Sequence, residues 1–195
     1  MRKIAALFLS GSLLFAASIK EIYYKSYDYE KMGAYKEAIK VLLPLYEKYP
    51  KGYTLNLRLG WLFYLNKNYN NAIDHYKKAS MILPTSLEPK LGLAMVYLSA
   101  KRYKAAKNAA LSVIHTDYYN YYGNSYLAKA LLGLKKFEDA KQVAQKMLTL
   151  YPTDILFLTL LARSYKGIDP KKAKKIYEEI LILDPNNVEA KEQVK

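Results

Sequence analysis

The sequence predicts an all-α fold, an α-solenoid of about five antiparallel helix pairs, and three observations predict it. Apolar and aromatic residues recur at three- and four-residue steps along almost the whole chain, which is the spacing of one face of a helix. Small residues, aromatic residues and prolines also return at an interval of 34 residues, as from Gly60 to Ala94. Since no Gly/Ser-rich linker divides the chain, we expect one continuous domain.

The clearest copy of the repeated unit is Tyr53–Ser86. Its first helix presents one face at Leu59, Gly60 and Phe63. A short break at 66–68 follows, and a second helix then presents a face at Tyr69, Ala72, Ile73, Tyr76 and Ala79. Pro84 ends that helix, because proline cannot continue the backbone hydrogen-bond ladder. Two helices joined by so short a turn must pack antiparallel.

Positions of this unit keep their chemical character from copy to copy. The position of Gly60 stays small, as Ser26, Ala94, Ala128 and Ala162. The position of Phe63 holds Tyr29, Tyr97, Leu131 and Tyr165. The position of Tyr69 is aromatic, as Tyr35, Tyr103 and Phe137. After the loop at 166–170 the register is one residue short and resumes with Ala173, Tyr177 and Pro185. A position that stays small indicates close approach of two helices.

This pattern resembles the tetratricopeptide repeat family from Ile19 to about Pro185. The resemblance implies a right-handed solenoid with units at 19–52, 53–86, 87–120, 121–154 and 155–187. The position at which the family carries tryptophan is filled here by Ile22, Asn56, Lys90, Asn124 and Leu158. Pro44 falls inside the second helix of the first unit, so we expect a kink there.

The two ends of the chain fall outside the units. Residues 1–18 combine Arg2 and Lys3 with an uncharged, largely apolar run, then small residues at Ala16 and Ser18, which predicts a secretory signal peptide. The run is about 14 residues long, short of the roughly 20 that cross a bilayer, and an uncleaved anchor is the alternative. Residues 188–195 predict the start of a C-terminal capping helix with a polar outer face.

Composition limits the chemistry that the chain can perform. There is no cysteine, which excludes disulfides, thiolate metal sites and cysteine nucleophiles. His75 and His115 belong to no metal-ligand pattern, and we expect both at the surface or at helix ends. No glycine-rich phosphate loop or nucleophile motif is present, so the sequence predicts no enzyme, no metal and no cofactor.

The candidate binding site is a concave groove. In the family that the sequence resembles, the second, fifth, ninth and twelfth positions of each unit line such a groove, and these positions are mainly aromatic or apolar in the first three units and more basic in the last two. The candidate partner-binding residues are Tyr23, Tyr27, Trp61, Tyr64, Met95, Tyr122, Lys129, Arg163 and Lys166. Exposed aromatic residues mark recognition surfaces. The alternative is that these rings pack against neighbouring units or against a terminal helix that fills the groove.

The sequence therefore predicts a non-catalytic protein–protein interaction scaffold of the cell envelope. We expect it to be exported, with the periplasm favoured over full secretion, to keep no transmembrane anchor after cleavage, and to bind a protein or peptide rather than nucleic acid. The chain has 31 Lys and Arg against 17 Asp and Glu, a net charge of +14. Two alternatives follow: a basic surface that binds an anionic polymer or a membrane surface, and an accessory subunit of a cell-wall enzyme complex.

Overall fold

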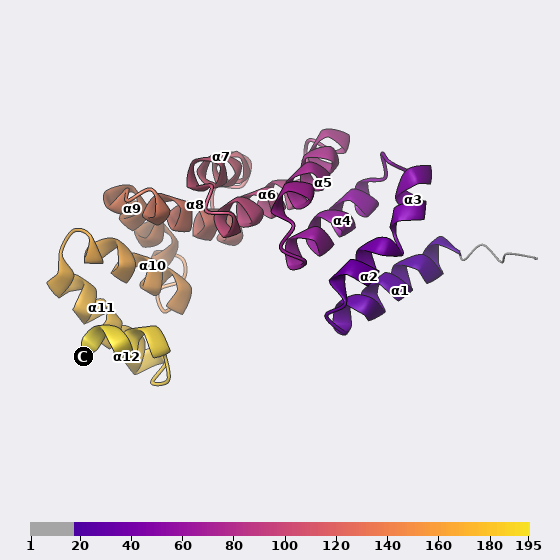
Figure 1. The fold of residues 1–195 in the computed structure, drawn as a ribbon. Coiled ribbons are helices and arrows are strands. Elements are labelled where there is room, and N and C mark those ends of the chain that lie inside the picture. Colours follow the sequence, from indigo (N-terminus) through magenta and orange to yellow (C-terminus); the bar gives the residue numbers. More distant parts are fainter. Residues whose placement is uncertain (1–17) are drawn as a thin grey trace, which may run out of the picture.

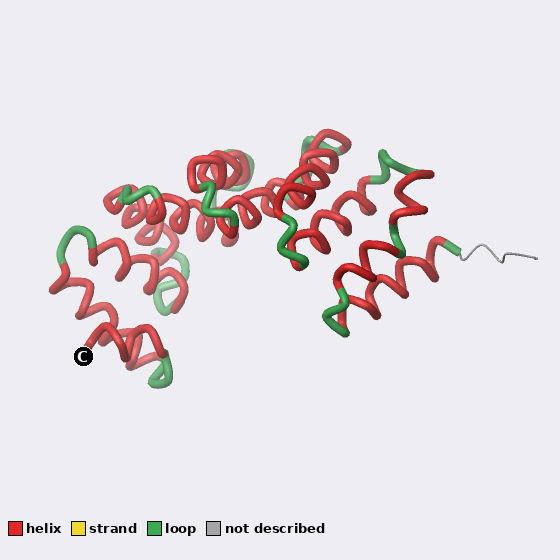
Figure 2. The backbone as a smooth tube through the Cα atoms, viewed as in Figure 1, coloured by secondary structure: helices red, strands yellow, loops and turns green. Residues whose placement is uncertain are grey.

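The computed structural model describes residues 18–195, so the predicted signal peptide lies outside the described residues except for Ser18. Within them the chain forms twelve helices and no strand, and the helices follow one another along an arc (Figure 1). Short loops join successive helices (Figure 2). The helices are α1 Ile19–Lys31, α2 Tyr35–Lys40, α3 Leu43–Lys48, α4 Tyr53–Leu65, α5 Tyr69–Ile82, α6 Glu88–Ser99, α7 Tyr103–Ile114, α8 Tyr121–Gly133, α9 Phe137–Leu148, α10 Ile155–Lys166, α11 Pro170–Leu183 and α12 Val188–Val194.

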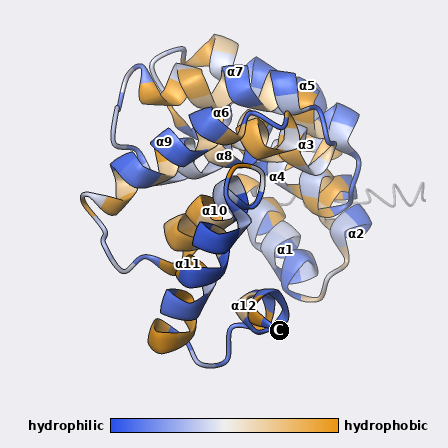
Figure 3. Ribbon diagram, turned by 90° about the vertical axis from the view of Figure 1, so that its left-hand side faces the viewer, coloured by the Kyte–Doolittle hydropathy of each residue, from blue (hydrophilic) through white to orange (hydrophobic). Residues whose placement is uncertain are grey.

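Five helix pairs stack into a solenoid, which confirms the predicted all-α architecture. Each first helix packs against its own second helix, and α4, α6, α8 and α10 also contact one another in sequence. Most helices carry both hydrophobic and hydrophilic residues, as expected of helices that bury one face (Figure 3). Each pair buries its apolar face on its neighbours, so the core runs the length of the array.

The turn inside each of the first four pairs depends on one residue with left-handed backbone. Gly33 has φ of 72°, and the residues 34, 68 and 102 positions later, Lys67, Lys101 and Lys135, have φ of 58°, 56° and 58°. This conformation ends the first helix and redirects the chain into the second. Glycine adopts it freely, whereas a residue with a Cβ does so at a cost.

The small position of the unit is a point of close helix contact, as the sequence predicts. Ser26, Ala94, Ala128 and Ala162 have no exposed surface. Gly60 and the nearby Gly92 both lie against the Tyr76 ring, and a Cβ built on Gly92 would lie 2.5 Å from Cε1 of Tyr76. A larger side chain at either glycine would displace that ring.

The second helix of the first pair is interrupted, which confirms the kink predicted from Pro44. The chain forms α2 and α3 in place of one helix, and Pro44 lies in the first turn of α3. Proline has no backbone N–H, so it is tolerated at a helix start and not in a helix interior.

His75 is buried, and its predicted place at the surface is wrong. Its ring stacks on Phe63 with centroids 5.3 Å apart and meets Tyr46 edge-on at 5.0 Å. Its Nδ1 lies 2.9 Å from Oδ1 of Asn56. The Nδ2 of Asn56 donates to the carbonyls of Pro50 and Gly52, so Oδ1 faces the histidine and Nδ1–H is the donor. Burial, followed by the charge of Lys78, lowers the pKa of His75 to about 4.

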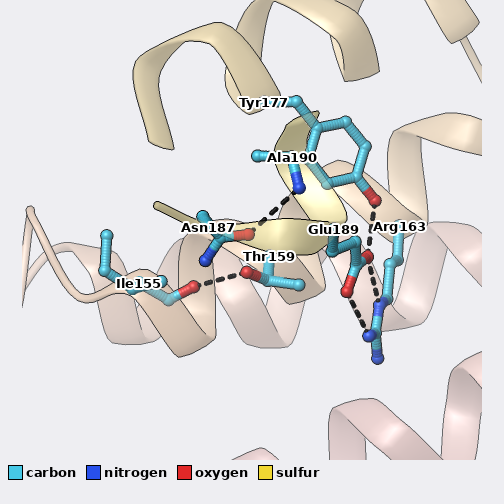
Figure 4. A network of polar contacts seen from close by, with 7 residues as sticks. All are labelled: Ile155, Thr159, Arg163, Tyr177, Asn187, Glu189 and Ala190. Atoms are coloured by element: carbon cyan, nitrogen blue, oxygen red, sulfur yellow. Dashed lines mark hydrogen bonds and ion pairs between the residues drawn. The ribbon is translucent and has the colours of Figure 1, made fainter. Parts of the chain in front are cut away.

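The last helix, α12, closes the C-terminal end of the solenoid. The Oδ1 of Asn187 accepts from the backbone N–H of Ala190, which is fully buried. Glu189 of α12 accepts hydrogen bonds from Arg163 of α10 and from Tyr177 of α11, 2.9 Å from the Tyr177 hydroxyl (Figure 4). These contacts hold α12 on the last pair. Between residues 18 and 195 there is no helix of the length and hydrophobicity that a membrane crossing requires.

Candidate protein-binding groove

A cavity of about 860 Å³ opens among the first helices of the N-terminal three pairs. Residues of α1, α4 and α6 form most of its wall, and Tyr35 of α2, Tyr76 of α5 and Tyr126 of α8 complete it. Aromatic and apolar side chains predominate in the lining, which includes Tyr27, Tyr35, Tyr53, Leu57, Trp61, Leu65, Leu91 and Met95. A cavity of this size accommodates several side chains of a bound segment.

One carboxylate organises the polar part of this groove. Glu30 forms an ion pair with Arg58, and its Oε1 accepts a hydrogen bond from Nε1 of Trp61 at 2.6 Å. The guanidinium of Arg58 also donates to Oγ of Ser26 and lies 3.8 Å from the centroid of the Tyr27 ring. The Arg58 side chain is only 6% exposed, so its charge is satisfied inside the protein. The indole of Trp61 is thereby fixed in one orientation on the groove wall.

Three of the predicted partner-binding residues, Tyr27, Trp61 and Met95, line the cavity. Tyr23 packs against the N-terminal core cluster, and burial, with the neighbouring Tyr27, raises its pKa. Tyr64 packs against the core of the second pair, with its ring centroid 5.6 Å from that of Trp61. These two rings are therefore supports of the groove wall.

The predicted residues of the last two units lie outside this cavity. Tyr122 is 60% exposed. Lys129 is half-buried with its Nζ 5.8 Å from the centroid of the Tyr126 ring, and burial and the charge of Arg163 lower its pKa. Arg163 is engaged by Glu189, and Lys166 is exposed. Of the three predicted cations, Arg163 thus already has an intramolecular carboxylate.

Other residues of the groove lie outside the second, fifth, ninth and twelfth positions, which the family resemblance assigns to the groove. Arg58, Gly92 and Tyr126 share the sixth position of their units. Gly92 contributes by leaving room for the ring of Tyr76, which reaches the groove from a second helix. A glycine in the interior of a helix, as at Gly92, is a signal in the sequence that could have indicated such an opening. Across residues 18–195 no group of three or more His, Asp or Glu side chains is placed to hold a metal ion.

Comparisons with known proteins agree with this architecture. Solved structures with a similar fold include a tetratricopeptide repeat protein from Parabacteroides merdae ATCC 43184, with 17% identity, a TM-score of 0.81, and coverage of 90% of this chain and 70% of that one. MamA (residues 41 to the end) from Desulfovibrio magneticus RS-1 has 19% identity, a TM-score of 0.77, and coverage of 87% and 96%. At these identities the likeness concerns the fold alone. A comparison with curated proteins finds no match.

The family models match the sequence itself. Three models, each described as tetratricopeptide repeat, match residues 25–81, 63–118 and 125–154. The matched segments contain the repeated positions of Ser26, Gly60, Ala94 and Ala128. Sequence periodicity, stacked helix pairs and family models lead to one conclusion: this chain belongs to the tetratricopeptide repeat family.

Proposed function

We propose that this chain is a scaffold that binds a segment of a partner protein in the groove of its first three helix pairs. The tetratricopeptide repeat fold is typically a non-catalytic module for protein–protein interaction. The observation that carries the proposal is the cavity of about 860 Å³ with Tyr27, Trp61 and Met95 on its wall. Large aromatic side chains held in place before binding provide contact area at low entropic cost.

The chemistry of the groove favours an apolar anchor in the bound segment. The charges of Glu30 and Arg58 neutralise each other, so the centre of the groove presents rings and methyl groups. Trp61 would be the main contact, because its indole is oriented by Glu30 while its ring remains on the cavity wall. Lys129, beyond Tyr126, would receive a carboxylate of the same segment, since no acidic side chain within the described residues pairs with it.

We place this function in the cell envelope, with the periplasm as the site. The support is the layout of residues 1–18, a basic start, an apolar run and small residues before the first helix. The partner would then be another envelope protein. Cellular fractionation and N-terminal sequencing of the purified protein test export and cleavage after Ser18.

The groove is tested by pull-down from envelope extract with residues 19–195 as bait. Trp61→Ala and Tyr27→Ala should each release the partner or weaken its retention at least about tenfold, as expected of interface anchors. Tyr122→Ala is the matched control, because Tyr122 is an exposed aromatic residue outside the cavity. Equal retention by the Trp61→Ala bait, with its folding verified by circular dichroism, would refute the groove as the binding site.

Salt separates this function from binding through the basic surface. Contacts of apolar rings depend little on ionic strength. A partner held by the basic surface, whose net charge is +12 in residues 19–195 (14 less the 2 of Arg2 and Lys3), would be released by moderate salt. Suppose that the Trp61→Ala, Tyr27→Ala and Tyr122→Ala baits all retain the partner at low salt and all lose it at high salt. That result would identify an anionic ligand of the basic surface instead.

A further inference from the structure

The fourth helix pair lacks an aromatic ring that the other pairs have. At the eleventh position of the unit the other pairs carry Tyr29, Phe63, Tyr97 and Tyr165. The fourth carries Leu131 at that position, on α8. Above Leu131 the structure has a cavity of about 430 Å³ between α7 and α9, on the side of the second helices and separate from the groove.

Comparison with the first two pairs shows what is missing. There Tyr46, Phe63 and His75 fill the equivalent space with three packed rings. The residues 68 positions later are Ile114, Leu131 and Val143, and all three line the cavity. Each is smaller than the ring that it replaces, so the cavity takes up space that side chains of the chain itself occupy in the earlier copy.

A buried polar atom without a hydrogen-bond partner, Oδ1 of Asn124, also marks the absence of the ring. Asn124 is equivalent to Asn56, and its Nδ2 donates to the carbonyls of Tyr118 and Asn120, as Asn56 does to those of Pro50 and Gly52. The two amides are therefore oriented alike, and Oδ1 of Asn124 is directed towards the Val143 position. Valine has no donor, and Oδ1 is buried without a hydrogen bond. The site thus lacks both the volume and the donor that His75 supplies in the earlier copy.

The rim of the cavity is basic and partly aromatic. Lys146 donates to the carbonyl of Tyr118 and lies 3.9 Å from the centroid of its ring, and burial lowers its pKa. Neither Lys146 nor Lys107 has a carboxylate partner among the described residues, and Asp139 is the one acid on the rim. A second cavity of about 680 Å³ shares Tyr118 and extends the basic rim to Lys90.

We propose that this face of the third and fourth pairs is a second protein-binding surface, which takes an aromatic side chain from an acidic segment of a partner. The aromatic side chain would fill the place of the missing ring over Leu131. Acidic neighbours in the segment would pair with Lys107 and Lys146. The surface lies on α7, α8 and α9, so the proposal does not depend on the groove of α1, α4 and α6. One chain would then join two partners.

The test is an NMR titration of isotope-labelled residues 19–195 with a short capped peptide that has phenylalanine between aspartates and glutamates. We expect saturable shift changes at Leu111, Ile114, Leu131 and Val143. The same peptide with alanine in place of phenylalanine should bind at least about tenfold more weakly, because the ring is the anchor. Equal binding of the two peptides, shift changes confined to the groove residues, or no change at millimolar peptide would each overturn the proposal.

Variants test the two parts of the surface separately. Leu131→Tyr supplies the ring that other units carry, so it should fill the cavity, preserve the fold and weaken the peptide at least about tenfold. Lys146→Gln leaves the cavity open and should weaken binding through the lost charge alone. Tyr24→Ala, at an exposed tyrosine of α1 that lines neither the groove nor this cavity, should leave the affinity unchanged. If Leu131→Tyr fails to fold, the Lys146→Gln variant and the alanine peptide still test the proposal. If neither change lowers the affinity between peptide and protein, the proposed surface is refuted.

Discussion

At the scale of single residues, the buried His75 makes the stability of this protein depend on pH. Its pKa is lowered to about 4 from an unfolded value of 6.5, because burial disfavours the charged imidazolium. Between these values the unfolded chain binds a proton that the folded chain does not, so the free energy of unfolding falls as the pH falls from 6.5 towards 4. The full contribution is present above pH 6.5.

A His75→Gln variant isolates this effect. Glutamine retains an N–H donor for Oδ1 of Asn56 and does not titrate. We expect its free energy of unfolding, measured by urea titration, to vary less between pH 6.5 and 4 than that of the wild type. Parallel pH profiles of the two proteins would show that carboxylates, and not His75, produce the dependence.

Two equivalent asparagines allow the contribution of one hydrogen bond, between Asn56 and His75, to the free energy of unfolding to be measured. Asn56 and Asn124 are both fully buried, and each donates to two backbone carbonyls, but only Asn56 also accepts from a histidine. Asn56→Ala leaves Nδ1 of His75 without a partner, whereas Asn124→Ala removes an oxygen that had none. We therefore expect Asn56→Ala to lower the free energy of unfolding by about 1–3 kcal/mol more than Asn124→Ala in chemical denaturation. Equal losses would contradict this.

At the scale of the elements, the turns between paired helices carry removable strain. Lys67 has φ of 58°, where the equivalent residue of the first pair is Gly33. A lysine in this conformation costs roughly 1–2 kcal/mol relative to its usual backbone, so Lys67→Gly should raise the free energy of unfolding by up to about 1 kcal/mol after the entropy cost of glycine. The measurement is the shift of the thermal midpoint.

The control for this turn is Lys77→Gly, at an exposed position inside α5. There glycine should lower the free energy of unfolding by about 1 kcal/mol, because it loses more backbone entropy in a helix. Opposite signs for the two substitutions would establish that backbone geometry, and not the loss of a lysine charge, sets the result. The same sign for both would contradict the interpretation.

At the scale of the whole molecule, stability should be local, because the main helix contacts within residues 18–195 join neighbouring pairs. Deleting residues 188–195 removes α12, exposes the core cluster around Tyr177 and Ile180, and frees Arg163 from Glu189. We expect hydrogen exchange to accelerate in α10 and α11 while α1–α4 keep their protection. A uniform loss of protection along the chain would show that the array unfolds as one cooperative unit.

The sequence alone determined the repeat and the fold. Periodic small and aromatic residues predicted the helix pairs, and Pro44 predicted the break between α2 and α3. Such features are local or recur at a fixed interval, so each helix reveals its own buried face. Of the residues that line the groove, Tyr27, Trp61 and Met95 were predicted, because they occupy positions that line such a groove in the family that the sequence resembles.

Only the tertiary structure decided which polar and aromatic side chains meet. Glu30, Arg58 and Trp61 come together across two helices. Arg163 forms an ion pair with Glu189 of α12. His75 lies three residues after Ala72 and four before Ala79, on the buried face of its helix. Only the stacking of the pairs brings Phe63 and Tyr46 against its ring. The physical reason is that a helical pattern specifies which face is buried, whereas the neighbour across that face depends on how successive pairs stack.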